Sequence, residues 1–347
     1  MRVFNLCLLG FGNVGRALAR LLVEKRDELR AEFGVGWRVT GVATRRLGWL
    51  AAPGGFGDEE LVSGDLRPRA AGGAGDTDGR LAAAGLEEWL ALSGCDVLFE
   101  TTPLDPLAGE PAVSYLRAAL RHGAHVLTAN KGPVVHAFAE LSGLARARGR
   151  RFLFEATVAD CLPVFSLFRE SLPAARLRAF AGVLNSTTTL VLEAMEAGAT
   201  FDEGVRRAQA LGVAETDPSH DLDGWDAVVK TCAVANVLMG AGLRPGDVRR
   251  EGLGRLGVGE VRAAAAAGEP YRLVARACLG DDGVVAASVG PERVMPLDPL
   301  AQAKGTTLAV TFDLDILPAL TLIAHRPDLK STAYAMLADF VAAVRER

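Results

Sequence analysis

Cysteine is scarce in this chain, which has five cysteines among 347 residues. Their number is odd, and no two of them have the C-x-x-C spacing that is typical of zinc sites and redox motifs. We therefore expect reduced core thiols in a cytoplasmic protein, and neither a disulfide framework nor a zinc site. The five are Cys7, Cys95, Cys161, Cys232 and Cys278.

Long apolar runs and blocks of basic residues are also missing. Charged side chains interrupt every apolar run well before the roughly 20 residues of a membrane-spanning helix. The N-terminus lacks the pattern of a signal peptide and enters a strand at once. The 38 Lys and Arg residues are outnumbered by 42 Asp and Glu residues, for a net charge of −4. This balance argues against a nucleic-acid partner and against an anionic membrane.

Hydrophobic residues, by contrast, make up 50% of the chain. This content allows a sizeable core, and the length predicts two or three domains. In the first part of the chain, short apolar runs alternate with helical periodicity, which predicts an α/β fold. Residues 51–85 are rich in Gly, Ala and Asp, and we expect a long loop there with a short strand around Leu61.

A glycine-rich turn follows the first expected strand at 3–9. It reads Gly10-Phe11-Gly12-Asn13-Val14-Gly15 and leads into a helical pattern. In a strand–turn–helix unit, the first Gly permits the tight turn and the second lets a pyrophosphate approach the backbone. The third lets helix and strand pack closely, and the helix N-terminus meets the phosphates. This context predicts dinucleotide binding; the alternative is a tight turn that binds nothing.

The residues after the second expected strand, 37–44, indicate whether NAD or NADP is the preferred cofactor. NAD-binding proteins usually carry an acidic residue there, which holds the ribose 2′-hydroxyl. This chain has Arg45 and Arg46 instead. Two guanidinium groups suit a 2′-phosphate, so we expect NADP to be preferred over NAD. The alternative is that both are solvated loop charges.

Two more strands, expected at 96–100 and 125–128, end in polar residues. Thr101 and Thr102 follow the first, and Asn130 and Lys131 follow the second. Ligands of doubly wound sheets bind at the carboxyl ends of the strands, which makes these residues candidates. By itself, a lysine such as Lys131 is more often a surface charge.

From residue 151 the alternation changes, and a second domain is expected. Its strands are predicted at 152–158, 176–184, 271–279, 284–289, 308–313 and 319–324. Over the whole chain, helices are predicted at 111–122, from 161, from the polar cluster 185–189 to 195, up to 210 and after 224. A closing helix is predicted at 331–347, with Ser331 or Thr332 as its cap. The cluster 185–189 alone suggests simple N-capping, at which Asn, Ser and Thr are effective.

The stretch 211–230 is the most informative part of the chain. Lys230 lies in an apolar helical run, four residues after Asp226, so the two share a helix face. The preceding loop carries Glu215, Asp217, Asp221 and Asp223. A lysine among apolar side chains and facing carboxylates is suited to proton transfer. The alternative is an exposed ion pair that contributes roughly 0.3–0.5 kcal/mol.

Together these segments resemble homoserine dehydrogenase. The matching stretches are GFGNVG at 10–15, TANKGP at 128–133, EATVADCLP at 155–163, GVLNSTTTLVLEAM at 182–195 and AQALGVAETDPSHDLDGWDAVVK at 208–230. The last is highly specific to that family, and the resemblance extends to about residue 313. The regulatory C-terminal module of some members is not expected here.

The resemblance implies a Rossmann domain at 1–133 plus 331–347 and an α+β substrate domain on a mixed sheet at 151–299. Segments 134–150 and 300–330 would connect them and form a homodimer interface. The enzyme would interconvert L-homoserine and L-aspartate 4-semialdehyde with NAD(P), in threonine and methionine biosynthesis. Lys131 and Lys230 resemble the two catalytic lysines of the family.

The remaining site residues are likewise implied by the resemblance. Substrate-binding positions are Glu215, Asp221, Asp226, Ser186 and Thr187. Cofactor-binding positions are Gly10, Gly12, Asn13, Val14, Gly15, Arg45, Arg46, Thr101, Thr102, Asn130 and Lys131. The main chain of Glu155, Val158 and Asp160 resembles a monovalent-cation loop that usually binds Na⁺.

Two departures from the family pattern bear on activity. Ser186 replaces a glycine beside the substrate, and residues 323–330 contain no glycine before the closing helix. We expect the serine to alter the substrate pocket and the stiff, basic segment to lie against the nicotinamide site; the alternative is that this segment lies elsewhere. Two other functions stay open: a paralogue that acts on a different small semialdehyde or hydroxy amino acid, and a cofactor-binding protein without catalysis.

Overall fold

The structure is a computed structural model and describes residues 2–66 and 79–345. The chain forms two compact units, each with its own internal packing. The first comprises Met1–Cys161 and Leu329–Arg347, and the second comprises Leu162–Asp328. None of the described helices combines the length and the hydrophobicity needed to cross a membrane.

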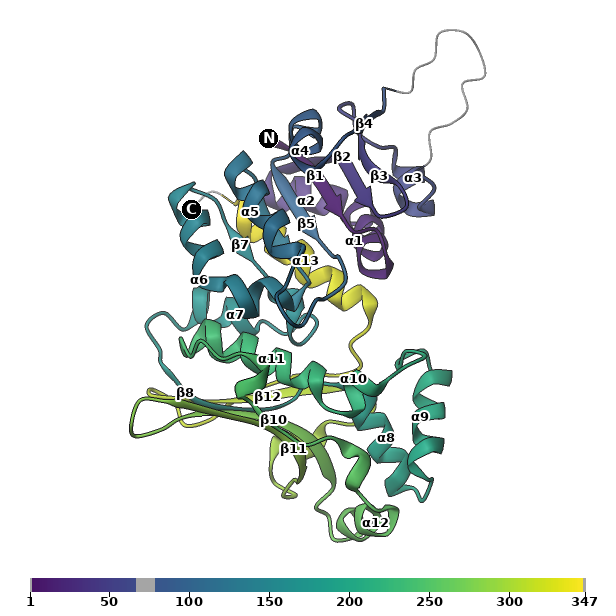
Figure 1. Cartoon of the computed structure of the whole chain (residues 1–347), viewed down its shortest axis with the longest axis vertical. Helices are drawn as coiled ribbons and strands as arrows, with labels where there is room; N and C mark the ends of the chain where they lie inside the picture. Colours follow the sequence, from purple (N-terminus) through teal and green to yellow (C-terminus); the bar gives the residue numbers. More distant parts are fainter. Residues whose placement is uncertain (1, 67–78, 346–347) are drawn as a thin grey trace. The chain divides into compact units, whose positions relative to one another are not determined.

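The first unit is built on a sheet whose described strands run in the order β4-β3-β2-β1-β5-β6-β7 (Figure 1). Strands β2, β1, β5, β6 and β7 are parallel, whereas β3 and β4 form an antiparallel edge. The strands are β1 (Arg2–Leu9), β2 (Val35–Thr44), β3 (Gly48–Ala51), β4 (Leu81–Ala83), β5 (Val97–Glu100), β6 (His125–Thr128) and β7 (Phe152–Leu153). The helices are α1 (Asn13–Glu24), α2 (Arg26–Phe33), α3 (Asp58–Ser63), α4 (Leu86–Ser93), α5 (Ala112–His122), α6 (Lys131–Ala147), η1 (Glu155–Thr157) and α13 (Leu329–Val344).

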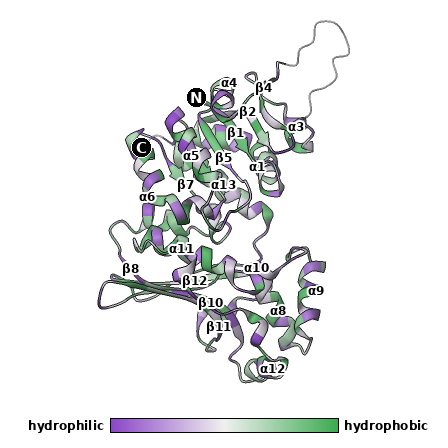
Figure 2. Cartoon of the chain, viewed as in Figure 1, coloured by the Kyte–Doolittle hydropathy of each residue, from purple (hydrophilic) through white to green (hydrophobic). Residues whose placement is uncertain are grey.

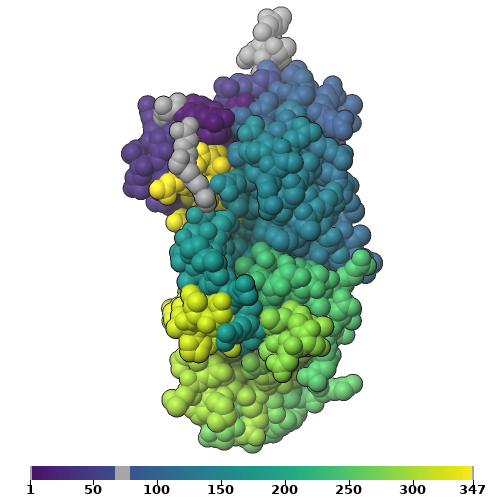
Figure 3. All heavy atoms as spheres, turned by 90° about the vertical axis from the view of Figure 1, so that its left-hand side faces the viewer, coloured from purple at the N-terminus to yellow at the C-terminus, as the bar shows by residue number. Residues whose placement is uncertain are grey.

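One core joins this sheet to helices from both ends of the chain. Figure 2 shows the central strands as largely hydrophobic, as expected for parallel strands covered on both faces. Phe340 of α13 is fully buried and packs edge-to-face against Phe4 of β1 and Phe99 of β5. The last helix therefore completes the N-terminal unit, and yellow atoms lie beside the purple atoms of the N-terminal residues in Figure 3.

The second unit has a mixed sheet with the described order β13-β12-β8-β10-β11-β9. Its pairs are antiparallel except β11 with β9, and helices α8 and α11 pack against β10. The strands are β8 (Leu177–Val183), β9 (Arg249–Arg250), β10 (Tyr271–Leu279), β11 (Val285–Arg293), β12 (Leu308–Leu314) and β13 (Leu320–Ala324). The helical segments are α7 (Val164–Ser166), η2 (Leu167–Ser171), α8 (Ser186–Glu196), α9 (Phe201–Ala210), α10 (Ser219–Leu222), α11 (Trp225–Leu238), η3 (Pro245–Asp247), η4 (Leu253–Arg255), α12 (Val258–Ala266) and η5 (Pro299–Gln302).

The expected fold class is confirmed: the chain has a Rossmann-like α/β unit and a second unit built on a mixed sheet. The division into three regions, with 134–150 and 300–330 as connections, stays a prediction.

Four local expectations were wrong. Leu61 lies in helix α3 instead of a strand, and the strand expected at 152–158 stops at Leu153 and gives way to the 3-10 turn η1. The closing helix begins at Leu329, so Ser331 and Thr332 lie inside it, and Asp221 lies on the short helix α10 instead of in a loop. Part of the expected long loop, residues 67–78, lies outside the described residues.

Candidate functional site

The glycine-rich turn has the geometry that its sequence predicts. It joins β1 to α1, and Gly10 has a φ of +94°, in the region that favours glycine. A Cβ on Gly10 would lie 2.6 Å from Thr101 Oγ1, and one on Gly15 would lie 2.6 Å from the Gly10 carbonyl oxygen. A Cβ on Gly12 would meet nothing within 4 Å, so packing within the protein does not require this glycine. A bare backbone with open space beside it fits the close approach of a pyrophosphate.

The loops after β5 and β6 meet this turn at the same edge of the sheet. Thr101 Oγ1 donates a hydrogen bond to the Gly10 carbonyl oxygen at 3.0 Å. Asn130 caps α6 by accepting from the Gly132 N–H at 2.9 Å, and its amide donates to the carbonyl oxygens of Thr102 and Pro103. Lys131 is the first residue of α6 and is half-buried. The expected cofactor residues of this edge thus lie on connected segments.

Glu100, the last residue of β5, was not anticipated as a site residue. It is fully buried, and its carboxylate accepts hydrogen bonds from Thr102 and from Thr128. Burial raises the pKa of the Glu100 carboxyl, while the hydrogen bonds from Thr102 and Thr128 act in the opposite direction. The signal in the sequence was an acidic residue that ends the apolar run 97–100.

Arg45 and Arg46 follow β2 directly, and both are exposed. Among the residues that the structure describes, neither guanidinium has a hydrogen bond or an ion pair. Both cations lie just after the carboxyl end of β2, where the ribose of a dinucleotide is held in such folds.

The loop expected to bind a cation is held by the closing helix. Asp160 has a left-handed φ of +51°, and its carboxylate accepts from Thr332 Oγ1 at 2.5 Å. The backbone N–H of Glu155 donates to the buried Asp339 carboxylate at 2.8 Å. Glu155 and Val158 are buried as well. These two contacts with α13 fix the conformation of the turn.

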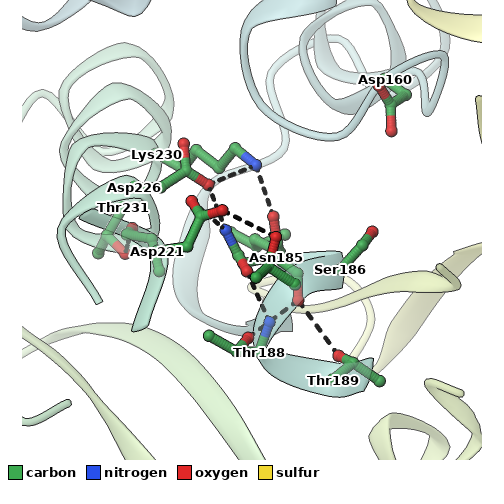
Figure 4. A network of polar contacts seen from close by, with 12 residues as sticks. Asp160, Asn185, Ser186, Thr188, Thr189, Asp221, Asp226, Lys230 and Thr231 are labelled. Carbon is green, nitrogen blue, oxygen red and sulfur yellow. Dashed lines mark hydrogen bonds and ion pairs between the residues drawn. The ribbon is translucent and has the colours of Figure 1, made fainter. Parts of the chain in front are cut away.

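In the second unit, Lys230 and Asp226 lie on α11 and form an ion pair of 2.9 Å (Figure 4). Their side chains are only 14% and 13% exposed, so the pair is not the solvated surface bridge of the alternative interpretation. Lys230 Nζ also donates to the Leu184 carbonyl oxygen at 2.6 Å. Carboxylate and carbonyl together fix the position of the amine.

Asn185 links this pair to a second carboxylate. Its side-chain N–H₂ group donates to Asp221 Oδ1 at 2.8 Å and to Asp226 Oδ2 at 3.0 Å. Thr187 Oγ1 donates to the other Asp221 oxygen at 2.8 Å. The two carboxylates and the single lysine carry a net negative charge, which suits the ammonium group of an amino acid.

Asn185 itself was missed as a site residue, because its N-cap role already accounted for it. It does cap α8, by accepting from the Thr188 N–H at 3.0 Å. Its other contacts span 36 and 41 residues of sequence, which no local pattern reveals.

Two expected substrate residues stand outside this network. The Glu215 side chain is exposed and has no hydrogen bond or ion pair among the described residues. Ser186 points away from Asn185 and the aspartates in Figure 4, and its hydroxyl donates to the Thr306 carbonyl oxygen at 3.1 Å.

The glycine-free segment 323–330 is exposed at His325 and Arg326. Lys330 pairs with Glu24 at 2.8 Å. Glu24 is the last residue of α1, and at a rise of about 1.5 Å per residue it lies about 14 Å along the helix from Gly15, the last residue of the glycine-rich turn. The contact of Lys330 is thus far from the turn, and the role expected for the rest of the segment stays a prediction.

Two models of known protein families match this chain. The model for the homoserine dehydrogenase family matches residues 163–341, and the model for the NAD-binding domain of homoserine dehydrogenase matches residues 10–155.

Individual relatives agree with this match. The chain is 35% identical to an NAD(+)-dependent homoserine dehydrogenase from Pseudomonas canavaninivorans, over 98% of this chain and 96% of that protein. A crystal structure of a homoserine dehydrogenase from Thiobacillus denitrificans superposes with a TM-score of 0.82 at 27% identity, covering 99% of this chain and 74% of that one. A hyperthermophilic archaeal homoserine dehydrogenase mutant in complex with NADPH superposes with a TM-score of 0.79 at 26% identity, covering 99% and 98%.

Proposed function

This chain belongs to the homoserine dehydrogenase family, whose NAD(P)-dependent members interconvert L-homoserine and L-aspartate 4-semialdehyde in threonine and methionine biosynthesis, and on that premise we propose that Lys230 is its proton-transfer group. When bound, the nicotinamide cofactor supplies the hydride chemistry. The protein must supply a base for the substrate hydroxyl and a pocket for the amino acid.

The observation that carries this assignment is the fixed, mostly buried Lys230 amine. Its Nζ lies 2.9 Å from Asp226 and 2.6 Å from the Leu184 carbonyl oxygen. An amine that is already held in place loses little entropy when the substrate hydroxyl arrives, which favours proton transfer. Lys131 is proposed as the second catalytic lysine, because it begins α6 beside the loops that surround the glycine-rich turn.

The substrate ammonium group is proposed to bind at the paired carboxylates Asp221 and Asp226. Asn185 holds both, and Thr187 holds Asp221, so the two charges have defined positions. Glu215 is proposed to add a third carboxylate from its exposed position, and Ser186 to shape the neighbouring wall of the pocket.

The dinucleotide is proposed to bind at Gly10, Gly12, Asn13, Val14 and Gly15, with Thr101, Thr102, Asn130 and Lys131 at the adjoining strand ends. For the choice of cofactor we propose NADP, because Arg45 and Arg46 offer two exposed guanidinium groups after β2. The relatives include both an NAD(+)-dependent enzyme and a complex with NADPH, so the arginines carry this proposal.

Three further parts of the proposal follow the family. The turn at Glu155, Val158 and Asp160 is proposed to bind Na⁺ through its carbonyl oxygens. Segments 134–150 and 300–330 are proposed to form a homodimer interface. The cytoplasm, where amino-acid precursors and NAD(P) are available, is the proposed location.

Replacing Lys230 by Ala tests the central assignment. We expect turnover of L-aspartate 4-semialdehyde with NADPH to fall at least about a thousandfold, within the range for losing a proton-transfer group. The Kd of NADPH, measured by fluorescence, should stay unchanged, since the glycine-rich turn is untouched. A kcat close to that of the parent enzyme would refute the role of Lys230.

A further inference from the structure

Glu100 is a buried carboxylate at the carboxyl edge of the first sheet. It ends β5 and stands in register between Leu9 of β1 and Thr128 of β6. It has no exposed surface, and a buried carboxylate is costly unless it is well hydrogen-bonded. The hydrogen-bond partners of Glu100 therefore indicate its role.

The contacts of Glu100 belong to a closed ring of hydrogen bonds. Its Oε1 accepts from the Thr102 N–H at 2.7 Å and from Thr102 Oγ1 at 2.5 Å, and its Oε2 accepts from Thr128 Oγ1 at 2.6 Å. Thr128 Oγ1 in turn accepts from the Asn130 N–H at 2.9 Å. The Asn130 amide closes the ring by donating to the Thr102 carbonyl oxygen at 3.2 Å.

The ring ties together two loops that leave neighbouring strands. One loop contains Thr101 and Thr102, and the other contains Asn130, which caps α6, and Lys131, which begins it. The side-chain donors to Glu100 come from Thr102, in the first loop, and from Thr128, at the point where the second loop begins. The carboxylate therefore sets the spacing of the two loops.

We propose that Glu100 is a positioning residue that fixes the N-terminus of α6, and with it Lys131, against the 101–103 loop. This inference rests on the proposed catalytic role of Lys131. A displacement of about 1 Å in a reacting group costs on the order of a hundredfold in rate, so a ring that fixes the start of α6 controls turnover without contact with the substrate.

The test replaces the ring members one at a time in the full-length chain. Glu100→Gln keeps the shape but puts an amide where two acceptor oxygens were, and Thr128→Val removes the hydroxyl that joins Glu100 to Asn130. Thr40→Val is the matched control, because Thr40 is a buried threonine of the same sheet whose hydroxyl has no hydrogen-bond partner in the part of the chain that the structure describes.

We expect kcat to fall about 10- to 100-fold in Glu100→Gln and in Thr128→Val, and to stay unchanged in Thr40→Val. The Kd of NADPH should change by a smaller factor than kcat, because the ring holds Thr102 and Asn130 at the edge of the proposed cofactor site, whereas the glycine-rich turn and Arg45 are intact. If Glu100→Gln fails to fold, Thr128→Val gives the answer alone. An unchanged kcat in the folded variants overturns the inference, as does a loss of NADPH binding equal to the loss of kcat.

A double-mutant cycle with Lys131→Ala separates this inference from the proposed function. If Glu100 acts through Lys131, Glu100→Gln should lower the residual rate of Lys131→Ala no further. The full 10- to 100-fold loss on that background overturns the inference and leaves the catalytic role of Lys131 standing. Normal turnover by Lys131→Ala overturns both.

Discussion

Arg45 and Arg46 are the residues on which the choice of cofactor turns. Each charge-assisted contact to a 2′-phosphate contributes up to roughly 1.5–3 kcal/mol, or about 10- to 100-fold in affinity. Replacing both by Ala should therefore lower kcat/KM with NADP at least about tenfold and leave kcat/KM with NAD unchanged. The control replaces Arg206 and Arg207, another exposed neighbouring pair, which lies on α9 in the second unit. Equal kcat/KM for the two cofactors in the parent enzyme would contradict the assignment.

Glu215 allows a second test at the scale of one residue. Its carboxylate is exposed and is proposed to attract the substrate ammonium group. Glu215→Gln should raise the KM for L-homoserine several-fold with little change in kcat, because it removes charge from binding and not from the chemical step. Asp217→Asn, in the same loop, removes the same charge from a side chain that is bonded to Ser219, and should leave the KM unchanged. Equal increases of the KM in both variants would mean that Glu215 acts only through the negative electrostatic potential of the loop and does not bind the ammonium group directly.

The ease of prediction differed between residues for a physical reason. Asp226 and Lys230 are four apart on a helix, so their ion pair follows from helical geometry and is confirmed. Asn185 acts across segments that are distant in sequence, which no local pattern reveals. Glu100 acts through burial and tertiary hydrogen bonds, and its position at the end of the apolar run 97–100 is the only local sign of this. Capping was the only role predicted for Asn185. Its side-chain oxygen does cap α8, but its side-chain nitrogen donates to Asp221 and Asp226.

At the scale of elements, Asn185 joins the start of α8 to the site on α10 and α11. Asn185→Ala should cost about 1 kcal/mol in unfolding free energy for the lost cap. It should also lower kcat/KM at least about tenfold, because Asp221 and Asp226 lose their shared donor. Thr200→Ala is the control: Thr200 caps α9 in the same unit and should cost similar stability with normal kinetics. If both variants had the same kcat/KM, Asn185 would serve only as the N-cap of α8 and would have no role in positioning the two aspartates.

Elements with a strong apolar period were predicted well, and those governed by tertiary contacts were not. Strand β10 was expected at 271–279 and is found there, and helix α11 follows Gly224 as expected. The stretch 152–158 reads as a strand from its apolar residues, yet the chain turns at Glu155, where the N–H bonds to Asp339 of α13. That partner lies 184 residues away, so local propensity could not predict where the strand ends.

At the scale of the molecule, the first unit is discontinuous in sequence. Its sheet comes from the start of the chain, whereas α13, which supplies buried side chains to the same core, comes from the end. The resemblance to a family predicted that the closing helix returns to the Rossmann unit, and hydrophobic periodicity alone could not. Stability of the cofactor-binding unit therefore depends on the last residues of the fold.

Phe340 tests this dependence. It is fully buried against Phe4 and Phe99, so Phe340→Ala should cost about 3–5 kcal/mol through lost burial and a residual cavity. Tyr334→Ala, on the same helix but 52% exposed, should change stability by no more than about 0.5 kcal/mol.

Because the chain has two units with separate cores, urea unfolding need not be a single transition. Saturating NADPH stabilises whichever unit binds it and so identifies the transition of the first unit. The loss caused by Phe340→Ala should fall on that transition, and the other should keep its midpoint. The opposite result would be that Phe340→Ala lowers the midpoint of the transition that NADPH does not shift. In that case α13 would not stabilise the cofactor-binding unit, contrary to what its packing indicates.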